Sequence, residues 1–587
     1  MEFSDISKVV CVSPSLIQIE VFDAKEYQCL ATKVSIGSYL KILDDNGLSI
    51  ITIVQSFRIK DLVREKEGED VTVPVFILEA QPVGFLDKDG NFKRGGQQIA
   101  IPPTKVEMAT DSDLEKIYKG LPDEKQFCFS SLSQSETIRA IVDGDRFFGK
   151  HIGVVGSTGS GKSCTVAKIL QEGIKGSTEQ DTKGILNNSH ILIFDLHGEY
   201  NSAFPKANTI SINNLLLPYW LMNSEELEEL FIESREQNSH NQVSQFKLAV
   251  IKNKEMHNPT LKVDYDEPVY FSLDEVYRYI YNQNRATKDA KTRELKIVDI
   301  AKFAGTPIEH ILFQEITFEE KAQGKINDGP YAGEFDRFVS RIETKLRDER
   351  LDFFLKPRDE KGGEYKTEHL IDILKQFLGY STNKSNITII DLSGIPFEVL
   401  SLVVSLITRL IFTFAFHFKK NLSGEAQKVP FLLVYEEAHN YIPQSEGAKY
   451  HSVKKSIERI AKEGRKYGVS LMIVSQRPSE ISETIFSQCN NFVAMRLTNP
   501  TDQQYIKRLL PDNINAVTDT LPILEKQEAI IIGDAISIPS IVKIDEISDK
   551  PNSNDVDFHQ EWKKDWYDVV FDKVIKHKAQ EDASTKK

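Results

Sequence analysis

A glycine-rich stretch between an apolar run and a helical pattern constrains the fold of this chain more than any other feature. The run Ile152–Val155 predicts a buried strand, and apolar residues at helical spacing follow Ser163. Glycines in such a loop let backbone N–H groups surround phosphate oxygens, and the positive end of the next helix points at the same anion. The stretch therefore predicts a phosphate-binding loop at the edge of an α/β sheet.

The nucleotide expected in this loop is ATP, together with Mg²⁺. In this pattern the lysine, here Lys162, reaches the β- and γ-phosphates, and the next hydroxyl, here that of Ser163, ligates the metal. A chance glycine-rich turn is the alternative, and the flanking strand and helix favour the phosphate-binding loop over it. The residues predicted to bind the nucleotide are Gly156, Ser157, Thr158, Gly159, Ser160, Gly161, Lys162, Ser163 and Cys164.

The size and charge of the chain limit the class of protein to which it can belong. Its 587 residues are too many for one core, so about two to four domains are expected. The net charge of −14 argues against a broad basic face that grips nucleic acid from outside, but it allows a few Lys or Arg to line the channel of a ring. The five cysteines are widely spaced and fit neither a metal site nor a disulfide framework, so a reducing cytosol is expected.

One segment, Val399–Phe416, is apolar and about long enough to span a bilayer. Arg409 lies inside it, and an arginine in the hydrocarbon core is costly. A predicted strand, Asn386–Gly394, also comes shortly before it. We therefore expect a buried helix of an α/β layer, and a cytoplasmic protein without a membrane partner.

Changes in pattern divide the chain into regions. Short apolar runs separated by turn signals such as Asp44–Gly47 predict a small N-terminal β-barrel that serves assembly. Apolar strands alternate with helices in the α/β core, and acidic helical patterns interrupt it. The expected regions are the barrel over 1–110, a linker with helical character over 111–146, the core over 147–212 and 383–550, a helical insertion over 213–382, and a helix with a disordered tail over 551–587.

The last of these helices is expected from about Phe558 to Lys576. It places Phe558, Trp562, Trp566 and Val570 on one face. That face either packs on its own domain or covers the nucleotide of a neighbouring chain, and the sequence leaves both readings open.

Acidic residues follow a second predicted strand within Ile191–Tyr200. Asp195 stands at the carboxyl end of this strand, and Glu199 comes four residues later. Ligands of open parallel sheets bind at that edge, so both acids are expected to face the nucleotide and its metal. The alternative is that Asp195 caps its own loop through backbone hydrogen bonds.

A pair of acids follows another apolar strand, Phe431–Tyr435. In nucleotide-hydrolysing sites with this pattern the first acid, here Glu436, holds Mg²⁺, and the second, here Glu437, polarises the attacking water. Glu436 stands where such sites commonly carry Asp, so its carboxylate reaches one methylene further. Two solvated loop acids are the alternative, which the apolar strand before them disfavours.

A further strand, Val469–Val474, ends just before Gln476, which is placed to sense the γ-phosphate or to position water. A basic helical segment precedes this strand. A solvated basic face is one explanation of that segment. In a ring of ATPases, however, one of its arginines can stabilise transition-state charge in the neighbour's site, and we favour Arg465, then Arg459.

Taken together, these motifs resemble the HerA helicase/translocase family of the FtsK-like ATPases. The resemblance rests on GSTGSGKS, DLHGEY, YEEAHNYIP and EGRKYGVSLMIVSQRPSEIS in this order after a β-rich N-terminus, and it covers nearly the whole chain. It implies an α/β, RecA-like P-loop ATPase core with N-terminal barrels on one face of a homohexameric ring. Lys150 stands where the family usually carries arginine.

The resemblance also implies an activity and partners. Rings of this family hydrolyse ATP between subunits, move double-stranded DNA through a central pore and work with a partner nuclease. Bacterial relatives are paired with anti-phage defence effectors, among them sirtuin-type NADases and nucleases. Our first hypothesis is accordingly an ATP-driven hexameric DNA translocase. The second is a ring-shaped scaffold that regulates a companion effector. A membrane-bound DNA pump rests only on Val399–Phe416.

Overall fold

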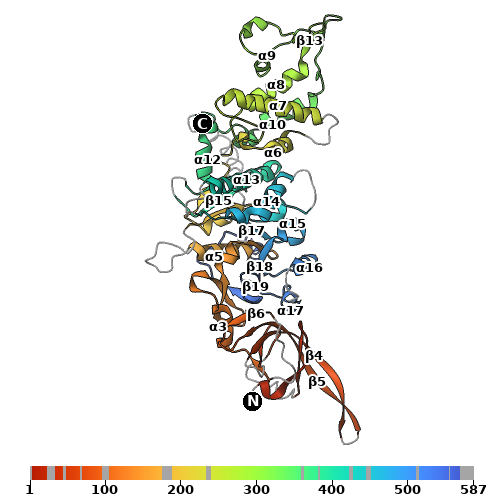
Figure 1. The fold of residues 1–587 in the computed structure, drawn as a ribbon, viewed down its shortest axis with the longest axis vertical. Coiled ribbons are helices and arrows are strands. Elements are labelled where there is room, and N and C mark those ends of the chain that lie inside the picture. The colour runs from red at the N-terminus through yellow and green to blue at the C-terminus, as the bar shows by residue number, and fades with distance from the viewer. Residues whose placement is uncertain are drawn as a thin grey trace. The chain divides into compact units, whose positions relative to one another are not determined.

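The fold was analysed in a computed structural model (Figure 1). The residues that it describes are 3–22, 34–43, 48–66, 69–95, 105–174, 188–232, 239–358, 362–380, 384–421, 428–444, 451–509, 515–553, 556–566, 568 and 571. They form two compact units, Met1–Pro551 and Asn552–Lys587. The predicted turn Asp44–Gly47 and the end of the final helix lie outside the described residues.

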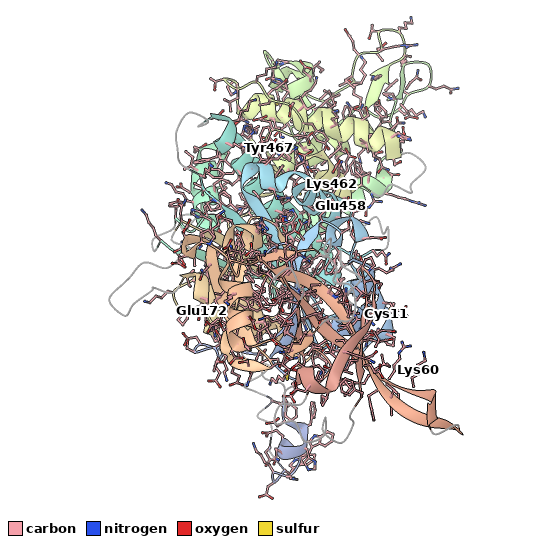
Figure 2. The ribbon with its side chains drawn as sticks, turned by 60° about the horizontal axis from the view of Figure 1, so that its bottom comes forward. Cys11, Lys60, Glu172, Glu458, Lys462 and Tyr467 are labelled. Atoms are coloured by element: carbon pink, nitrogen blue, oxygen red, sulfur yellow. The ribbon has the colours of Figure 1, made fainter. Side chains whose placement is uncertain are left out.

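The N-terminal region is an antiparallel sheet in the order β1-β2-β5-β4-β3-β7, with β6 paired to β5. The end strands β1 and β7 contact each other, so the sheet curls as a half-barrel around its own apolar core. The β4–β5 hairpin extends beyond the rest of this sheet and carries Lys60 (Figure 2). Its elements are α1 (Phe3–Ile6), β1 (Ser7–Val12), β2 (Ile17–Val21), β3 (Tyr39–Leu43), β4 (Ser49–Lys66), β5 (Glu69–Leu86), β6 (Phe92–Arg94) and β7 (Lys105–Met108).

The central sheet has eleven strands in the order β12-β15-β11-β16-β17-β10-β18-β19-β20-β8-β9. The strands from β12 to β18 run parallel, and the remaining four continue the sheet antiparallel. Strands buried on both faces need continuous apolar runs, and the parallel strands of this sheet carry them. All eleven strands have the following bounds. They are β8 (Gln126–Leu132), β9 (Ser135–Asp143), β10 (His151–Val155), β11 (His190–Asp195), β12 (Asn208–Ile210), β15 (Ile387–Asp391), β16 (Phe431–Tyr435), β17 (Val469–Ser475), β18 (Cys489–Met495), β19 (Glu528–Gly533) and β20 (Ser540–Ile544).

The linker with helical character expected over 111–146 is wrong for most of its length. After helix α3 (Asp111–Lys119), the chain forms β8 and β9, which belong to the central sheet. The strand β8 pairs with β20, more than 400 residues later, as in the register of Leu132 with Val542. That long-range pairing, together with the packing of Phe127 and Phe129 against Phe147, selects strands here, and neither is visible in a local pattern.

Between β12 and β15 the chain leaves the central sheet. It forms several helices and a two-stranded ribbon of β13 (Thr287–Asp289) and β14 (Ile326–Asp328). Phe335, Phe338 and Ile342, which the sequence places at helical spacing, are fully buried around α10. The helices are α6 (Ser224–Phe231), α7 (Ser239–His257), α8 (Leu273–Arg285), α9 (Ile308–Ile311), α10 (Asp336–Arg347), α11 (Asp352–Leu355) and α12 (Leu370–Phe377).

The remaining helices of this unit follow strands of the central sheet. Helix α5 begins directly after the glycine-rich loop, and α14 comes before β17. Most of their apolar side chains join the core that surrounds the sheet. Their bounds are α4 (Gly144–Phe148), α5 (Lys162–Ile174), α13 (Phe397–Asn421), α14 (His451–Glu463), α15 (Glu483–Phe486), α16 (Pro500–Leu509) and α17 (Asn515–Asp519).

The apolar helix α13 is long and hydrophobic enough to cross a membrane, but 78% of its most apolar window is buried inside the protein. Its Arg409 forms an ion pair with the fully buried Glu226 of α6, with Nη2 2.7 Å from Oε2. The same guanidinium donates to the carbonyl oxygen of Leu221 at 2.6 Å, and the Ser405 hydroxyl donates to Glu226 at 3.0 Å. The charge of Arg409, which is unusual in an apolar helix, therefore holds α13 against α6 through an ion pair.

The described part of the second unit includes the short helix α18 (Phe558–Glu561). The helix predicted to continue through Trp566 is not formed, because the chain turns at Trp562. Trp562 and Trp566 are 79% and 94% exposed, so their apolar surface is not buried. A short helix without a packed face is marginal in water, which accounts for the difference.

We predict that Arg409→Met lowers the free energy of unfolding by about 3 kcal/mol, because Glu226 is left charged and buried without its partner. Denaturant unfolding followed by circular dichroism measures the change. In the control, Glu226→Gln is combined with Arg409→Met, which removes both charges and should recover most of the loss. A loss below about 1 kcal/mol in the single variant would show that the pair is not what holds these helices together.

Candidate functional site

The site lies where the parallel strands of the central sheet end. The glycine-rich loop follows β10, and the segments after β11, β16 and β17 reach the same edge, because parallel strands present their carboxyl ends together. This arrangement brings residues more than 270 positions apart in the sequence into contact. The Ser163 hydroxyl, for example, lies 3.5 Å from Glu436 Oε1.

The loop itself has the backbone of a phosphate cradle. Gly159 and Gly161 have φ angles of 75° and 101°, which residues with a Cβ rarely adopt. At Gly156 a Cβ would lie 2.5 Å from Ser160 Oγ and 2.9 Å from a side-chain atom of Met495. Each of the three glycines is thus required by the local geometry.

Lys162 starts helix α5 and is only 7% exposed. In the described part of the chain its ammonium forms no ion pair and donates no hydrogen bond, and the buried Ser160 hydroxyl also lacks a partner. A buried cation and an orphaned hydroxyl beside a glycine cradle fit the phosphates of ATP. Cys164 is half-buried next to them, and burial raises the pKa of its thiol.

The two acids after β16 are both buried, but they are held differently. Glu436 Oε2 accepts a hydrogen bond of 2.5 Å from the Tyr200 hydroxyl, and Oε1 faces Ser163. Burial raises the pKa of Glu436 to about 8, with the neighbouring Glu437 acting in the same direction. The extra methylene of a glutamate at this position is therefore compatible with contact to the loop serine.

Glu437 has a φ of 45°, in the left-handed region that favours glycine. Its Oε2 is buried without a hydrogen bond and lies 3.4 Å from Nδ1 of His439. Burial lowers the pKa of His439, whose ring also contacts the hydroxyl of Ser475 at 3.2 Å. A buried carboxylate oxygen with no donor is available to a ligand such as a water molecule.

Gln476 follows β17 and faces the glycine-rich loop. Its Oε1 accepts a hydrogen bond of 2.5 Å from the Thr158 hydroxyl. It also lines a cavity of about 480 Å³ together with Phe397, His439 and Arg477. Gln476 therefore lies beside the glycine-rich loop, and its role toward the terminal phosphate stays a prediction.

Asp195 takes the role that the sequence left as the alternative. Its carboxylate accepts hydrogen bonds from the backbone N–H groups of Gly198, Glu199 and Tyr200, at 2.9, 3.2 and 2.9 Å. These bonds use both oxygens to cap the loop after β11, so the expectation that Asp195 faces the nucleotide is corrected. The carboxylate of Glu199 instead lies within hydrogen-bonding reach of Ser163, and burial raises its pKa.

The two candidate arginines lie away from their own chain's loop. Arg465 is exposed in the short turn Gly464–Tyr467 before β17, so the length of that strand, about 20 Å, separates it from Gln476. Arg459 lies on α14 with its guanidinium 5.0 Å from the centre of the Phe412 ring. Figure 2 labels Glu458, Lys462 and Tyr467 in the same segment. Neither arginine reaches its own loop, so a role in a neighbour's site stays a prediction.

Tyr200 is the site residue that pattern reasoning did not single out. It is fully buried, and its hydroxyl fixes one oxygen of Glu436. The residue stands inside the HGEY turn, so the motif was visible in the sequence. What was not visible is that capping by Asp195 turns the chain and directs this phenol toward β16.

The acids present suit Mg²⁺ that is held mainly by phosphates and water. Ser163 and Glu436 supply two oxygens, with Glu199 beside them. No cluster of three or more His, Cys, Asp or Glu that could hold a metal by itself occurs among the described residues. This donor set fits magnesium bound with a nucleotide, where the protein supplies only one or two ligands.

Known proteins were compared with the chain. The family described as "Helicase HerA, central domain" matches residues 127–411. The DNA double-strand break repair helicase HerA of Sulfolobus acidocaldarius is 28% identical over 92% of this chain and 90% of its own length. The probable counterpart in Methanocaldococcus jannaschii is 26% identical over 90% and 95%. Among solved structures, VirB4 of Thermoanaerobacter pseudethanolicus aligns with a TM-score of 0.45 at 13% identity, over 73% of this chain and 98% of that one.

The family match begins within β8 and ends in α13, so it spans the loop, the segment between β12 and β15 and the start of the helix that follows. The similarity to the full-length relatives extends over about nine-tenths of both chains. With its glycine-rich loop and paired acids at one sheet edge, the chain is similar to the HerA helicases over most of its length.

Proposed function

We propose that this chain is a DNA translocase that hydrolyses ATP between the subunits of a homohexameric ring. Its similarity to the HerA helicases supports an ATP-hydrolysing enzyme of helicase or translocase type. The observation that carries the proposal is the contact of Ser163 with Glu436, beside the unpaired buried Lys162. It unites a phosphate cradle with an acid pair in one pocket.

The side chains divide the work at this pocket. Lys162 and the loop N–H groups hold the phosphates, and Ser163 with Glu436 holds Mg²⁺, which when bound neutralises phosphate charge. Glu437, whose Oε2 lacks a donor, accepts the proton of the attacking water. Gln476 orients that water or the terminal phosphate, and Tyr200 keeps Glu436 in place.

In the proposed ring, a neighbouring subunit supplies the arginine that one chain does not bring to its own site. Arg465 lies at the opposite strand ends from its own loop, which supports a role in the neighbouring subunit's site, with Arg459 as the second candidate. The relatives named as DNA repair helicases support double-stranded DNA as the substrate. A partner nuclease or a sirtuin-type effector, a cytoplasmic location and a role in anti-phage defence belong to the same proposal.

The direct test measures ATP turnover of the purified protein with and without duplex DNA, and its mass with and without nucleotide. The proposal expects stimulation by DNA and a mass of six chains.

The acidic net charge of −14 favours the second candidate function, a ring that regulates a companion effector. DNA-independent turnover that responds only to an added partner would favour that candidate instead.

Lys162→Ala should abolish ATP binding, because no other side chain in the loop supplies a cation to the phosphates. Binding of a fluorescent ATP analogue measures the effect. The matched control is Lys206→Ala, which removes an exposed lysine far along the chain from the loop. Unchanged affinity in Lys162→Ala would exclude this loop as the nucleotide site.

Glu437→Gln should retain ATP binding and lose at least about 100-fold in turnover, since the amide cannot take the proton from water. Single-turnover hydrolysis separates the two effects. Glu480→Gln is the control, because Glu480 is an exposed acid that lines the same cavity. Normal turnover in Glu437→Gln would move the role of base to another acid, with Glu199 beside Ser163 as the next candidate.

Tyr200→Phe should raise the Mg²⁺ concentration needed for half-maximal turnover by about tenfold, because a positioning hydrogen bond to Glu436 is lost. A magnesium titration of ATPase rate measures it. Tyr435→Phe removes another fully buried phenol, one that bonds to Thr408 and not to an acid, and so controls for loss of stability. Equal magnesium dependence in both variants would contradict the role given to Tyr200.

A further inference from the structure

A groove of about 770 Å³ lies between α10 and the start of α13. We call it the α10 groove. Its lining is almost wholly charged or hydroxylated, with Leu351 and Val399 as the apolar exceptions. The residues that α10 contributes along most of its length are Asp336, Arg337, Ser340, Arg341, Thr344 and Lys345.

These residues form one face of the helix. Their spacings of three and four positions place them above one another, so the cations at 337, 341 and 345 make a straight row. Eight residues at the rise of an α-helix span about 12 Å. That length corresponds to about three to four base-pair steps of duplex DNA.

The row contains cations that the protein does not neutralise. Within the described ranges, Arg337 and Lys345 form no ion pair, and their side chains donate no hydrogen bond. Burial lowers the pKa of Lys345, and the charge of the neighbouring Arg341 lowers it further, while the charges of Asp348 and Glu398 act in the opposite direction. Arg341 donates to the carbonyl oxygen of Phe231 at 3.2 Å, which fixes its position in the row.

Three acids face the groove beside four cations. Arg350 pairs with Asp348 at 2.7 Å and approaches Glu398 at 3.7 Å. Asp336 accepts a hydrogen bond of 2.7 Å from the neutral Asn284 amide, which leaves its charge in place. The lining therefore keeps an excess of one positive charge, in a chain whose net charge is −14.

We infer that the α10 groove binds the sugar–phosphate backbone of double-stranded DNA, with Arg337 and Lys345 pairing with phosphates and the Ser340 hydroxyl donating to one. Such donors are those that contact phosphates in protein–DNA interfaces. Protein interfaces are instead depleted in charge at their centre and enriched in aromatics, which disfavours a protein occupant. The inference rests on the proposed translocase function and names the surface on which the DNA lies.

The groove and a second cavity share the start of α13. Glu398 and Val399 line the groove, while the preceding residue, Phe397, lines the cavity that contains His439 and Gln476. A phosphate backbone seated along α10 would contact this turn, which connects DNA binding with the segments that follow β16 and β17.

The test uses the full-length protein and a duplex DNA without sequence preference, at several salt concentrations. Arg337→Glu combined with Lys345→Glu should weaken binding at least tenfold near 0.1 M salt and lower the slope of log affinity against log salt by about two. Stimulation of ATPase by DNA should fall in parallel, while turnover without DNA stays unchanged. The milder pair Arg337→Gln and Lys345→Gln should show the same order of effects with less risk to folding.

Arg347→Glu is the matched control, because Arg347 is an exposed arginine of α10 that lies outside the groove. Binding in both pairs equal to that of this control would overturn the groove assignment and leave the translocase proposal standing. If the unaltered protein neither binds duplex DNA nor responds to it, both proposals fall. Loss of basal turnover in both pairs would also overturn the assignment, because it would make the row a structural part of the ATPase.

Discussion

The parallel pairing of β11, β16, β17 and β10 is the constraint on which the site depends. Four strands from distant parts of the chain end at one edge, and each delivers a different chemical group there. The hydrogen bond of 3.5 Å between Ser163 and Glu436 joins the glycine-rich loop to the acid pair. If these strands did not share one direction, the cradle and the acids would belong to opposite ends of the sheet.

Burial then determines how each group behaves at that edge. Glu436 is held between a serine and a phenol, so its oxygens have defined positions before any ligand arrives. The carboxylate of Asp195 accepts hydrogen bonds from backbone N–H groups, and this capping directs Tyr200 into the core. The residues of the HGEY turn thus act on the site mainly through the fold, with Glu199 as the member that faces the loop serine.

The pattern of the sequence was sufficient for the central strands, because buried parallel strands need continuous apolar runs and a glycine-rich loop has a fixed spacing. It predicted the positions of Lys162, Glu436 and Gln476 at one edge for the same reason. It failed for β8 and β9, whose pairing with β20 is a contact over more than 400 residues. It also failed for the continuation of α18, where helical spacing of aromatics exists without a surface that buries them. The choice between site and cap for Asp195 depended on three backbone hydrogen bonds, which no spacing encodes.

The backbone of Glu437 has a consequence for the evolution of this chain. A glutamate at a φ of 45° holds a conformation that costs on the order of 1 kcal/mol relative to glycine or asparagine. Replacement of Glu437 by glycine would relax the turn and raise the free energy of unfolding, but it would also remove the carboxylate. Selection for stability alone would thus favour glycine here, so a glutamate in this geometry is what the proposed role of its carboxylate would require.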